Sequence, residues 1–474
     1  MHPAWMDEAV ADGSSYAALE QWLGFSPLQL QGVTVGLLGL GESNKAALHA
    51  LHQRGARLLV HDDHPFATWS QALPEGVEAV SGSLPVEALR LLVKSPGIPY
   101  THPTVRRAMQ AGLPVVTELE LGFWWSQAPI IGITGTNGKT TTTTLVGAML
   151  ERAEEQVAVC GNIGIPLLTA TEQLPQEGIA VVECSSFQLQ GTLAFRPAVA
   201  TLLNLSEAHL DYHGSFEAYR AAKMKIFANQ TNRQLALLNA RQWESTEAEH
   251  LTRAHLAFFG RPIDGFPSAW EQEGQLYVAL PEGPVQHLLA RAELRLRGAH
   301  NVENALAAAL LALLAGAPLE AVAQTLRDFH GVPHRLEEVS NSAGHAIYND
   351  AKATNPQAAM VALTSVDPPI VWIAGGLDRG DDFDPLLPVL QKRVRAAYLY
   401  GETKETLAEL CQRAGIETVV IGERLVDVLP QALRSLRQGE TLLYSPGCAS
   451  WDQYHHFEER GEEFKRLVST WQSQ

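Results

Sequence analysis

The sequence predicts an α/β protein of three domains, in which two Rossmann-like domains flank a central P-loop-type ATPase domain. Strand–turn–helix patterns start afresh in three segments of the chain, and such alternation is typical of doubly wound parallel sheets. The length of 474 residues suits about three domains of roughly 150 residues each. Apolar residues make up 46% of the chain and charged residues 18%, which is enough apolar material for three cores.

The first segment alternates short apolar strands with polar turns. A strand at 33–38 runs into the turn 39–43, Gly-Leu-Gly-Glu-Ser, and a second apolar strand ends at Asp62. This pattern predicts a Rossmann-like domain over residues 31–126. We assign residues 1–30 to an N-terminal extension.

The second segment, residues 127–330, opens with the most informative stretch of the chain, IIGITGTNGKTTTTT at 130–144. An apolar strand leads into a Gly-rich turn that ends in Gly138-Lys139-Thr140. Such a turn points amide groups at a nucleoside triphosphate and adds a lysine and a hydroxyl for its magnesium. The strict P-loop pattern requires glycine where Ile133 stands, so this is a variant loop. The residues predicted to bind ATP are Gly135, Thr136, Asn137, Gly138, Lys139, Thr140 and Thr141.

An acid at the end of a later strand is a candidate ligand for magnesium. Glu183 follows the apolar run 179–182, and side chains at the carboxyl ends of parallel strands point into the ligand crevice. Carboxylate oxygen is a ligand that Mg²⁺ prefers. By itself the signal is weak, because a glutamate at a strand end can simply reach solvent, but beside a phosphate loop it favours a functional role.

Other polar residues of this segment are ambiguous on sequence grounds. His209 and His213 are four residues apart, as in a zinc-binding helix, but no Glu follows His209, which disfavours zinc proteolysis. The position of His209, after an apolar strand and in the same layer as the acid, leaves a structural and a functional role open. Lys223 lies on an amphipathic helix and is expected to be solvated. Asn301 and Asn304 open the most apolar helix, where capping explains one of them.

The third segment, residues 331–474, is again predicted to be a doubly wound α/β domain. Dense polar turns follow three of its strands, at 349–355, 375–380 and 445–450. Because the carboxyl ends of parallel strands share one edge of a sheet, these turns should converge on one anion-binding face.

Composition excludes several classes of function. The net charge is −17 and no basic run exceeds a pair, which argues against a nucleic-acid partner. The four cysteines lie far apart without a CxxC, so neither a disulfide framework nor a zinc site is expected. The acidic N-terminus does not look like a signal peptide, and the longest apolar stretch, 305–319, is too short to span a bilayer and should form a buried helix. We expect a cytoplasmic protein that does not insert into membranes.

Seven motifs occur in an order that resembles the Mur ligases of bacterial cell-wall synthesis. They are GTNGKTT, ECSSFQL, YRAAK, HNVENALAA, PHR, NDAKATN and SPGCAS followed by DQ, and the resemblance covers residues 32–470. It implies a UDP-binding domain, an ATPase domain and an amino-acid-binding domain in a monomer. It also implies an ATP-dependent amide-bond-forming ligase. The nearest activity adds D-glutamate to UDP-N-acetylmuramoyl-L-alanine through an acyl phosphate, in the synthesis of peptidoglycan precursors.

The resemblance also assigns roles to individual residues. Lys139, His209 and Lys223 are implied to be catalytic. Two Mg²⁺ ions are implied, one held by Thr140 and Glu183, the other by His209 and a carbamylated Lys223. Further ATP contacts fall on Asn301, Arg335 and Asp350. The nucleotide-sugar side falls on Gly41, Ser43, Asp62, Asn162 and Gln188. The D-glutamate side falls on Lys352, Thr354, Arg379, Ser445 and Phe457.

Some positions depart from the family pattern. Ala208 stands where many members carry Asp, and Arg379 where the D-glutamate enzyme often has Lys. Asn44 replaces the third glycine of a dinucleotide fingerprint, and Asp63-His64 replaces a Thr-Arg pair near uracil. The alternatives are a sister ligase for another amino acid, a folylpolyglutamate synthase-like enzyme, and a non-catalytic nucleotide-binding regulator. An oxidoreductase that uses Gly39-Leu-Gly41 is the weakest of them.

Overall fold

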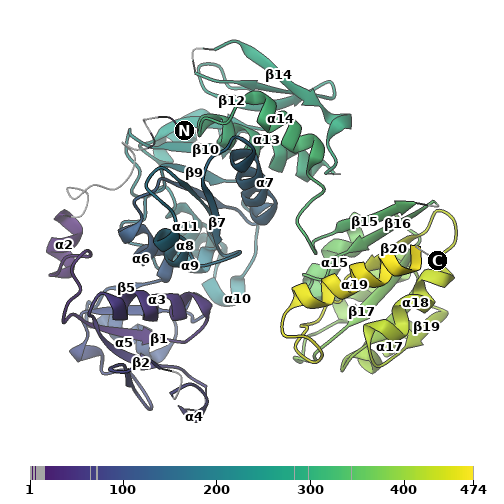
Figure 1. Cartoon of the computed structure of the whole chain (residues 1–474), viewed down its shortest axis with the longest axis horizontal. Helices are drawn as coiled ribbons and strands as arrows, with labels where there is room; N and C mark the ends of the chain where they lie inside the picture. The colour runs from purple at the N-terminus through teal and green to yellow at the C-terminus, as the bar shows by residue number, and fades with distance from the viewer. Residues whose placement is uncertain are drawn as a thin grey trace. The chain divides into compact units, whose positions relative to one another are not determined.

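Three β-sheets organise the chain, in agreement with the predicted three-domain α/β fold. The computed structural model describes Pro3, Met6 and residues 17–64, 66–70, 73–281, 283–296, 298–342 and 344–472. The chain divides into two units, Met1–Phe329 and His330–Gln474 (Figure 1). The first unit holds two sheets and the second unit holds one.

The first sheet has five parallel strands in the order β3-β2-β1-β4-β5. Its strands are β1 (Thr34–Leu38), β2 (Arg57–His61), β3 (Glu78–Ala79), β4 (Leu91–Lys94) and β5 (Val115–Val116). The helical elements around it are α2 (Ala17–Leu23), α3 (Glu42–Gln53), α4 (Phe66–Trp69), η3 (Val86–Ala88), α5 (Pro103–Gln110) and α6 (Glu118–Trp125). Helix α3 packs in one core cluster and α5 in another, so the sheet has a core on each face. The expected Rossmann-like arrangement is therefore present.

The middle sheet has nine strands in the order β14-β13-β12-β11-β10-β9-β6-β8-β7. Its parallel part comprises β6 (Ile130–Thr134), β7 (Val157–Gly161), β8 (Ile179–Glu183), β9 (Val199–Leu202), β10 (Leu235–Asn239), β11 (His255–Phe259) and β12 (Ser268–Gln272). The strands β13 (Gln275–Ala279) and β14 (Val285–Ala290) extend it in antiparallel fashion. Strands β11 to β14 make residues 255–290 rich in β-structure.

Helices cover both faces of the middle sheet (Figure 1). One core cluster joins the sheet to α7 (Lys139–Arg152), α13 (Ala299–Leu314) and α14 (Leu319–Asp328). The opposite cluster contains α6 and α8 (Leu167–Gln173) and α9 (Ser186–Gln190), and it continues into the first sheet. The remaining elements of this unit are α10 (Leu210–His213), α11 (Phe216–Met224), α12 (Ser245–Leu251) and η4 (Arg291–Glu293).

The apolar stretch 305–319 forms the buried part of α13 and the turn that follows it, in agreement with the expected buried helix. Helix α13 ends at Leu314, and α14 begins at Leu319. Gly316 separates them with a φ of 100°, a left-handed conformation that glycine adopts readily. No helix among the described residues is long and apolar enough to cross a membrane.

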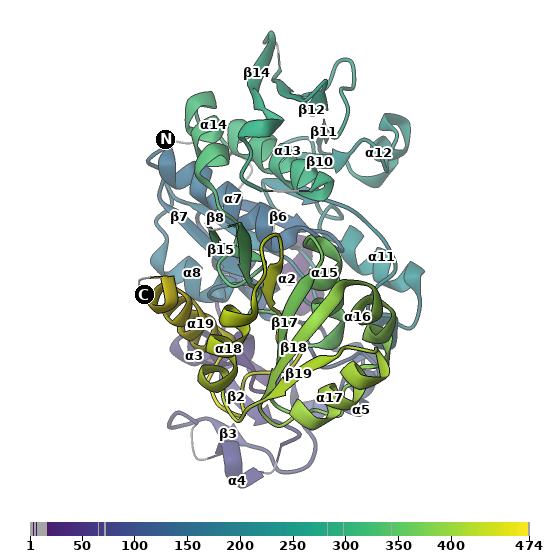
Figure 2. The ribbon, with the colours of Figure 1, turned by 90° about the vertical axis from the view of Figure 1, so that its right-hand side faces the viewer.

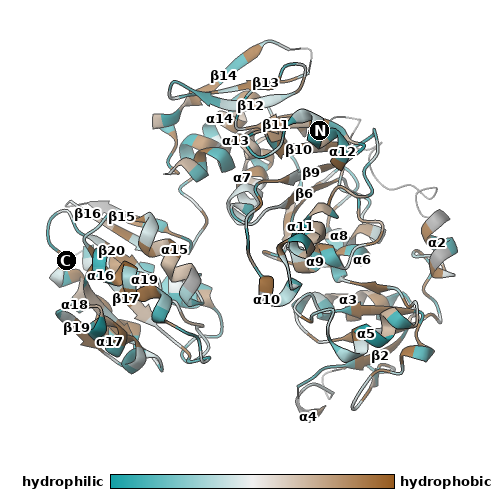
Figure 3. Cartoon of the chain, turned by 180° about the vertical axis from the view of Figure 1, so that it is seen from behind, coloured by the Kyte–Doolittle hydropathy of each residue, from teal (hydrophilic) through white to brown (hydrophobic). Residues whose placement is uncertain are grey.

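The third sheet, in the second unit, has the order β15-β16-β20-β17-β18-β19. Its strands are β15 (Glu337–Ser342), β16 (His345–Asn349), β17 (Ile370–Gly375), β18 (Val394–Tyr400), β19 (Thr418–Ile421) and β20 (Thr441–Tyr444). Only the edge strand β15 is antiparallel. Figure 2 shows β17, β18 and β19 side by side. In Figure 3 brown, apolar colour marks the buried strand β17.

Two core clusters lie on opposite faces of this third sheet, as a doubly wound fold requires. One contains α15 (Pro356–Ser365), η5 (Asp384–Leu386), α16 (Leu387–Arg393) and α17 (Lys404–Arg413), and the other contains α18 (Leu425–Ser435) and α19 (Phe457–Gln472). All four cysteines, Cys160, Cys184, Cys411 and Cys448, are buried and free, in agreement with the expected absence of disulfides.

Truncation of the buried face of α13 should destabilise the first unit. Leu310 is fully buried in the cluster that α13 shares with α7. We expect Leu310→Ala to lower the free energy of unfolding by about 2–5 kcal/mol, through lost apolar burial and a residual cavity. Urea unfolding followed by circular dichroism measures this change. Val285→Ala is the control, since Val285 is 58% exposed and should change stability by less than about 0.5 kcal/mol. Equal effects of the two substitutions would contradict the assigned packing.

Candidate active site

The phosphate loop joins β6 to α7 through a tight left-handed turn. Gly138 is the N-cap of α7 with a φ of 83°. A Cβ atom at this position would lie 2.1 Å from Oδ1 of Asn304, so a larger side chain has no room. No side chain caps α7, which leaves the first amides of the helix available to an anion.

A set of hydrogen bonds holds the middle of the loop in place. The amide of Asn137 donates to Oδ1 of Asn204 (2.8 Å), and Nδ2 of Asn204 donates back to the carbonyl of Asn137 (3.0 Å). The hydroxyl of Tyr219 donates to Oγ1 of Thr136 (3.0 Å). The amide of Ser206 also donates to that oxygen (3.0 Å). The loop is therefore fixed by the segment that follows β9 and by α11.

Two lysines converge on the same loop carbonyl. Nζ of Lys139 donates to the carbonyl oxygens of Gly135 (2.9 Å) and Thr136 (3.0 Å). Nζ of Lys223 donates to the carbonyl oxygen of Gly135 at 2.7 Å. Lys223 is 1% exposed, so its expected solvation is wrong. Burial, followed by the nearby charge of Lys139, lowers the pKa of Lys223 to about 6.

Glu183 ends β8 directly beside the start of the phosphate loop. It pairs with Ile133 of the neighbouring strand β6. Its Oε1 accepts a hydrogen bond from Nδ2 of Asn162 (2.8 Å). Its Oε2 is buried and has no hydrogen-bond partner in the described part of the chain. A buried, unpartnered carboxylate oxygen is what a cation would satisfy, and the burial of Glu183 excludes the alternative of simple solvent exposure.

The donor set at this point fits magnesium better than a transition metal. Thr140, the second residue of α7, is buried at the same end of the sheet as Glu183. No group of three or more His, Cys, Asp or Glu side chains that could hold a metal ion occurs among the described residues. Mg²⁺ commonly uses one or two protein oxygens and takes further ligands from phosphates and water, so Thr140 and Glu183 suffice as its protein ligands.

His209 lies in an aromatic cluster rather than directly at a strand end. Strand β9 ends at Leu202, and His209 is the N-cap of the short helix α10, with a left-handed φ of 54°. Its ring centroid is 5.0 Å from that of Phe187 and 6.1 Å from that of Tyr219. The Tyr219 ring lies 4.9 Å from Nζ of Lys223, which places His209 and Lys223 in one cluster. Nε2 of His213 faces Oγ of Ser186 at 3.0 Å.

The start of α13 also reaches the phosphate loop. Gly298 is the N-cap of this helix and has no capping side chain, so the expectation that an asparagine caps it is wrong. Nδ2 of Asn304 donates to Oδ1 of Asn301 (3.1 Å), while Oδ1 of Asn304 faces Gly138. The second asparagine therefore connects Asn301 to the loop.

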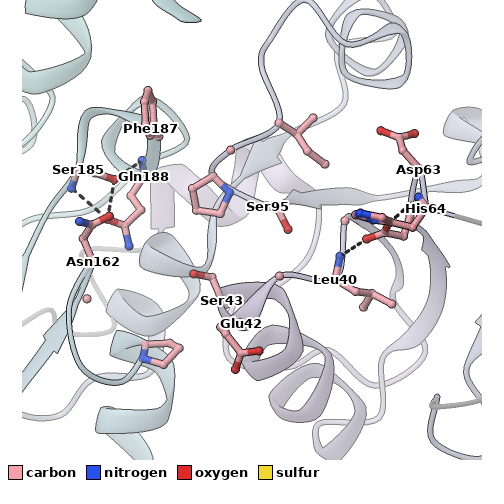
Figure 4. A pocket seen from close by; sticks show the side chains of 18 of the residues that line it. Leu40, Glu42, Ser43, Asp63, His64, Ser95, Asn162, Ser185, Phe187 and Gln188 are labelled. Carbon is pink, nitrogen blue, oxygen red and sulfur yellow. Dashed lines mark hydrogen bonds and ion pairs between the residues drawn. The ribbon is translucent and has the colours of Figure 1, made fainter. Parts of the chain in front are cut away.

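A cleft of about 590 Å³ lies between the first and middle sheets of this unit (Figure 4). All five residues predicted for the nucleotide-sugar side line it, namely Gly41, Ser43, Asp62, Asn162 and Gln188. Because Asn162 also donates to Glu183, the cleft is connected to the candidate metal position by one side chain.

The wall of the cleft formed by the first sheet is tightly organised. Burial opposes ionisation of Asp62, but hydrogen bonds from His64 and from the amide of Leu40 (2.7 Å) outweigh it and lower its pKa. Gly41 is the N-cap of α3 without a capping side chain, which leaves helix amides for an anion. Nδ2 of Asn44 donates to the carbonyl oxygens of Leu38 (3.0 Å) and Gly39 (2.8 Å), so this buried residue closes the turn where a dinucleotide fingerprint has glycine.

In the second unit, the three predicted polar turns come together. Oγ of Ser445 donates to Oδ2 of Asp350 (2.7 Å), and the amide of Gly447 donates to the carbonyl of Ala353 (2.9 Å). The amide of Gly375 donates to the carbonyl of Pro446 (3.0 Å). Burial raises the pKa of Asp350 to about 7, against the hydrogen bond from Ser445.

The remaining predicted residues of this unit sit on or beside these turns. Nζ of Lys352 lies 5.8 Å from the ring centre of Phe457, and Cζ of Arg379 lies 5.8 Å from the ring centre of Trp451. Thr354 follows on the turn of Lys352 and is partly buried. Arg335 is close enough to Asp350 to favour its ionised form.

Ser445 is fully buried and gives its hydroxyl to Asp350. The contact of Ser445 with D-glutamate stays a prediction, because a hydroxyl that donates its proton can still accept a hydrogen bond. The hydroxyl ties the turn after β20 to the turn after β16.

Sequence reasoning missed three residues that shape the site. Asn204 and Tyr219 hold the phosphate loop, and Arg460 joins two turns of the second unit. Arg460 is fully buried, and its Nη2 donates to the carbonyls of Ala351 (2.9 Å) and Cys448 (2.8 Å). An asparagine after an apolar strand is a usable signal, whereas Tyr219 and Arg460 lie on ordinary amphipathic helices.

Three family models match successive parts of the chain. Residues 33–117 match the Mur ligase MurD-like N-terminal domain, residues 133–312 match the Mur ligase middle domain, and residues 334–448 match the Mur ligase glutamate ligase domain. The first and third matches each contain one sheet, and the middle match contains the middle sheet except for the first three residues of β6.

Curated relatives match over nearly their whole length. The chain is 43% identical to the UDP-N-acetylmuramoylalanine–D-glutamate ligase of Geobacillus kaustophilus, over 91% of this chain and 96% of that protein. It is 44% identical to the protein of the same name from Halalkalibacterium halodurans, over 90% of this chain and 95% of that one. Among solved structures, MurF from Acinetobacter baumannii is similar in fold, with a TM-score of 0.55, 18% identity, and coverage of 93% and 92%. Escherichia coli FolC in complex with ADP is similar in fold as well, with a TM-score of 0.54, 17% identity, and coverage of 75% of this chain and 93% of that one. On the strength of the three successive domain matches and these full-length relatives, the chain belongs to the Mur ligase family.

Proposed function

We propose that this protein is an ATP-dependent ligase that adds D-glutamate to UDP-N-acetylmuramoyl-L-alanine in the synthesis of peptidoglycan precursors. The relatives at 43–44% identity are named for this reaction. The observation that carries the chemistry is the buried, unpartnered Oε2 of Glu183 beside the phosphate loop. An acid in that position has a clear use with a metal–nucleotide complex and no evident structural use.

The nucleotide is expected to bind along the phosphate loop. The start of α7, which no side chain caps, suits the phosphate chain, and Lys139 supplies a positive charge there. Thr140 and Glu183 would hold Mg²⁺, which would neutralise phosphate charge when bound. Asn301, linked to the loop through Asn304, is a candidate for the nucleoside end.

The cleft of the first unit suits the nucleotide sugar. The uncapped N-terminus of α3 at Gly41 and Ser43 favours a diphosphate. Asp62, ionised because hydrogen bonds lower its pKa, provides an acceptor for the sugar or base. Asn162 and Gln188 line the end of the cleft nearer Glu183, where the alanyl carboxylate must reach the phosphoryl group.

The second unit offers cations suited to a dicarboxylic amino acid. Lys352 and Arg379 lie on the converging turns, and each is placed over an aromatic ring. Thr354 adds a hydroxyl on the same turn as Lys352. Phe457 supports Lys352 from the start of α19. Arg335 and Asp350, from the same unit, are proposed to complete the ATP contacts.

The reaction then proceeds in two displacements. A carboxylate oxygen of the alanyl group attacks the γ-phosphorus of ATP, and ADP leaves. The amine of D-glutamate next attacks the acyl carbon, loses a proton and displaces phosphate, which leaves an amide. Lys139 stabilises charge on the transferring phosphoryl group, and the loop amides orient it. Lys223 and His209 are proposed as ligands of a second Mg²⁺, with Lys223 carrying a carbamate.

An amino-acid panel tests this function. Phosphate release is measured with ATP, UDP-N-acetylmuramoyl-L-alanine and one of D-glutamate, L-glutamate, L-lysine, meso-diaminopimelate or L-alanine. We expect D-glutamate to exceed the others at least about a hundredfold in kcat/KM, because a mismatched carboxylate or amine leaves the charged groups of the site unpaired. Preference for another amino acid would indicate a sister ligase. Release that needs a folate instead of the nucleotide sugar would indicate a folylpolyglutamate synthase-like enzyme.

The same assay separates an enzyme from a nucleotide-binding regulator. A regulator would hydrolyse ATP, if at all, at a rate that does not depend on the nucleotide sugar. We also propose that the protein acts as a monomer in the cytoplasm, where its nucleotide substrates are made, without a nucleic-acid partner. Sedimentation velocity measures the oligomeric state.

A further inference from the structure

Lys94 is a buried lysine that the proposed reaction does not use. It ends β4 and is fully buried. Its Nζ donates to the carbonyl oxygens of Ile98 (2.9 Å) and Pro96 (3.3 Å). No carboxylate pairs with it among the described residues, and burial lowers its pKa to about 7. An ammonium without a counter-ion is costly to bury, so its presence at this point requires an explanation.

Tyr212 completes a cluster of polar groups around this amine. We call it the Lys94 cluster; it consists of Lys94, Tyr212 and the carbonyl groups of Pro96 and Ile98. The hydroxyl oxygen of Tyr212 lies 3.2 Å from Nζ of Lys94 and accepts a hydrogen bond from it. The same hydroxyl lies 2.8 Å from the carbonyl oxygen of Pro96 and 2.9 Å from that of Ile98. Because a hydroxyl has one proton, it donates to one of these carbonyls at a time. Both carbonyls are therefore shared between Lys94 and Tyr212.

On one side, the Lys94 cluster adjoins the nucleotide-sugar cleft. Ser95, Pro96, Gly97 and Ile98 all line the cleft, and Figure 4 shows Ser95 in its middle. The carbonyls that Lys94 holds thus belong to the loop that a ligand in the cleft would contact. A shift of this loop on binding would move the Lys94 cluster with it.

On its other side, the Lys94 cluster adjoins the turn that carries His209. Tyr212 lies on α10, and its amide donates to the carbonyl of His209 at 3.2 Å. The ring of Tyr212 is 4.3 Å from that of Phe187, which lines the cleft and also contacts His209. A histidine with a φ of 54° keeps that conformation only where its surroundings hold it. The attachment of Tyr212 is one such constraint.

We propose that Lys94 and Tyr212 form a positioning pair that fixes the cleft loop 95–98 and the His209 turn to each other. Binding of the nucleotide sugar in the cleft then sets the place of His209 for phosphoryl transfer. Neither residue touches the reacting atoms, so both act through the two segments that they join. This inference rests on the proposed function, because it concerns how that reaction is assembled.

Tyr212→Phe tests the pair, since it removes one hydroxyl and keeps the ring against Phe187. We expect kcat to fall about tenfold from misplacement of the His209 turn, with the KM for ATP changed less than about twofold, because the pair does not contact the phosphate loop. Tyr100→Phe is the matched control. The Tyr100 ring also lies beside the pair, 4.9 Å from Nζ of Lys94, but its hydroxyl donates to the carbonyl of Gln190 on α9 (3.2 Å). Tyr100→Phe therefore removes a hydroxyl from the same region without breaking the proposed link to the His209 turn. Tyr100→Phe should leave kcat within about twofold.

Lys94→Met and the double variant provide the second measurement. If the two residues act as one unit, Lys94→Met with Tyr212→Phe should lower kcat no further than the more damaging single change. If the losses of kcat in the two single variants multiply in the double variant, the proposed pair is overturned. It is also overturned if Tyr212→Phe keeps its kcat as Tyr100→Phe does. If Lys94→Met does not fold, the comparison of the two tyrosine variants decides.

The outcome also separates this inference from the proposed function. If the wild-type protein shows no D-glutamate-dependent phosphate release, the proposed function fails. If the wild type is active and Tyr212→Phe retains its kcat, only the positioning role fails. Similar losses of thermal stability in both tyrosine variants, with a fall of kcat in Tyr212→Phe alone, would support positioning over a merely structural role.

Discussion

Lys139→Ala is expected to abolish turnover, lowering kcat at least about a thousandfold. The phosphoryl group gathers negative charge as it leaves ADP, and Lys139 is the ammonium at the first position of α7, on the phosphate loop. Its loss removes a charge that the loop amides cannot replace. Phosphate and ADP release with all three substrates measure turnover, and trapping with hydroxylamine measures the acyl phosphate directly.

The variant should remain folded, which makes the result interpretable. The ammonium of Lys139 donates to the carbonyls of Gly135 and Thr136, and the loss of these hydrogen bonds should change stability by about 1 kcal/mol. The control is Lys392→Ala, because Lys392 is an exposed lysine on α16. A Lys139→Ala protein with more than about a tenth of wild-type turnover would contradict the role of the loop.

The central strands of the fold are predictable from the sequence because buried parallel strands are continuous apolar runs. The apolar runs 441–444 and 370–374, which precede two of the predicted polar turns, form β20 and β17, the latter with one more residue. The edge strands β15 and β3 escaped prediction. Both contain few apolar residues, because an edge strand faces solvent, and such a sequence resembles that of a turn.

The location of the site was predictable for the same reason that the sheets were. Glu183 and the polar turns of the second unit follow apolar runs, and parallel strands bring their carboxyl ends to one edge. The burial of Lys223 was not predictable. A helical pattern identifies the apolar face of α11 but does not show that its polar face packs on the phosphate loop. The left-handed turn at His209 and the internal use of Ser445 likewise depend on tertiary contacts.

Lys223→Ala is expected to lose most activity, about a hundredfold or more in kcat. The reason is chemical. Burial and the charge of Lys139 lower the pKa of Lys223 to about 6, so the amine is mostly uncharged at neutral pH. An uncharged amine adds CO₂, forms a carbamate and releases a proton, and the product offers oxygen ligands to a cation. The unmodified ammonium would instead repel a second Mg²⁺ beside His209. Phosphate release measures the loss.

Chemical rescue distinguishes a carbamate from an ordinary buried lysine. A short-chain carboxylic acid, such as acetate or propionate, should restore part of the activity of Lys223→Ala, because its carboxylate can occupy the space of the carbamate. The same acids should not rescue Lys139→Ala, where a positive charge is missing. Lys225→Ala is a further control, since Lys225 lies two residues on and donates to the carbonyls of Gln190 and Thr192, both at 2.7 Å, away from the phosphate loop. Normal activity of Lys223→Ala without added acid would refute the role, because the oxygen ligand would then be dispensable. Loss of activity without rescue would leave the buried amine itself as the required group, held for its hydrogen bond to Gly135.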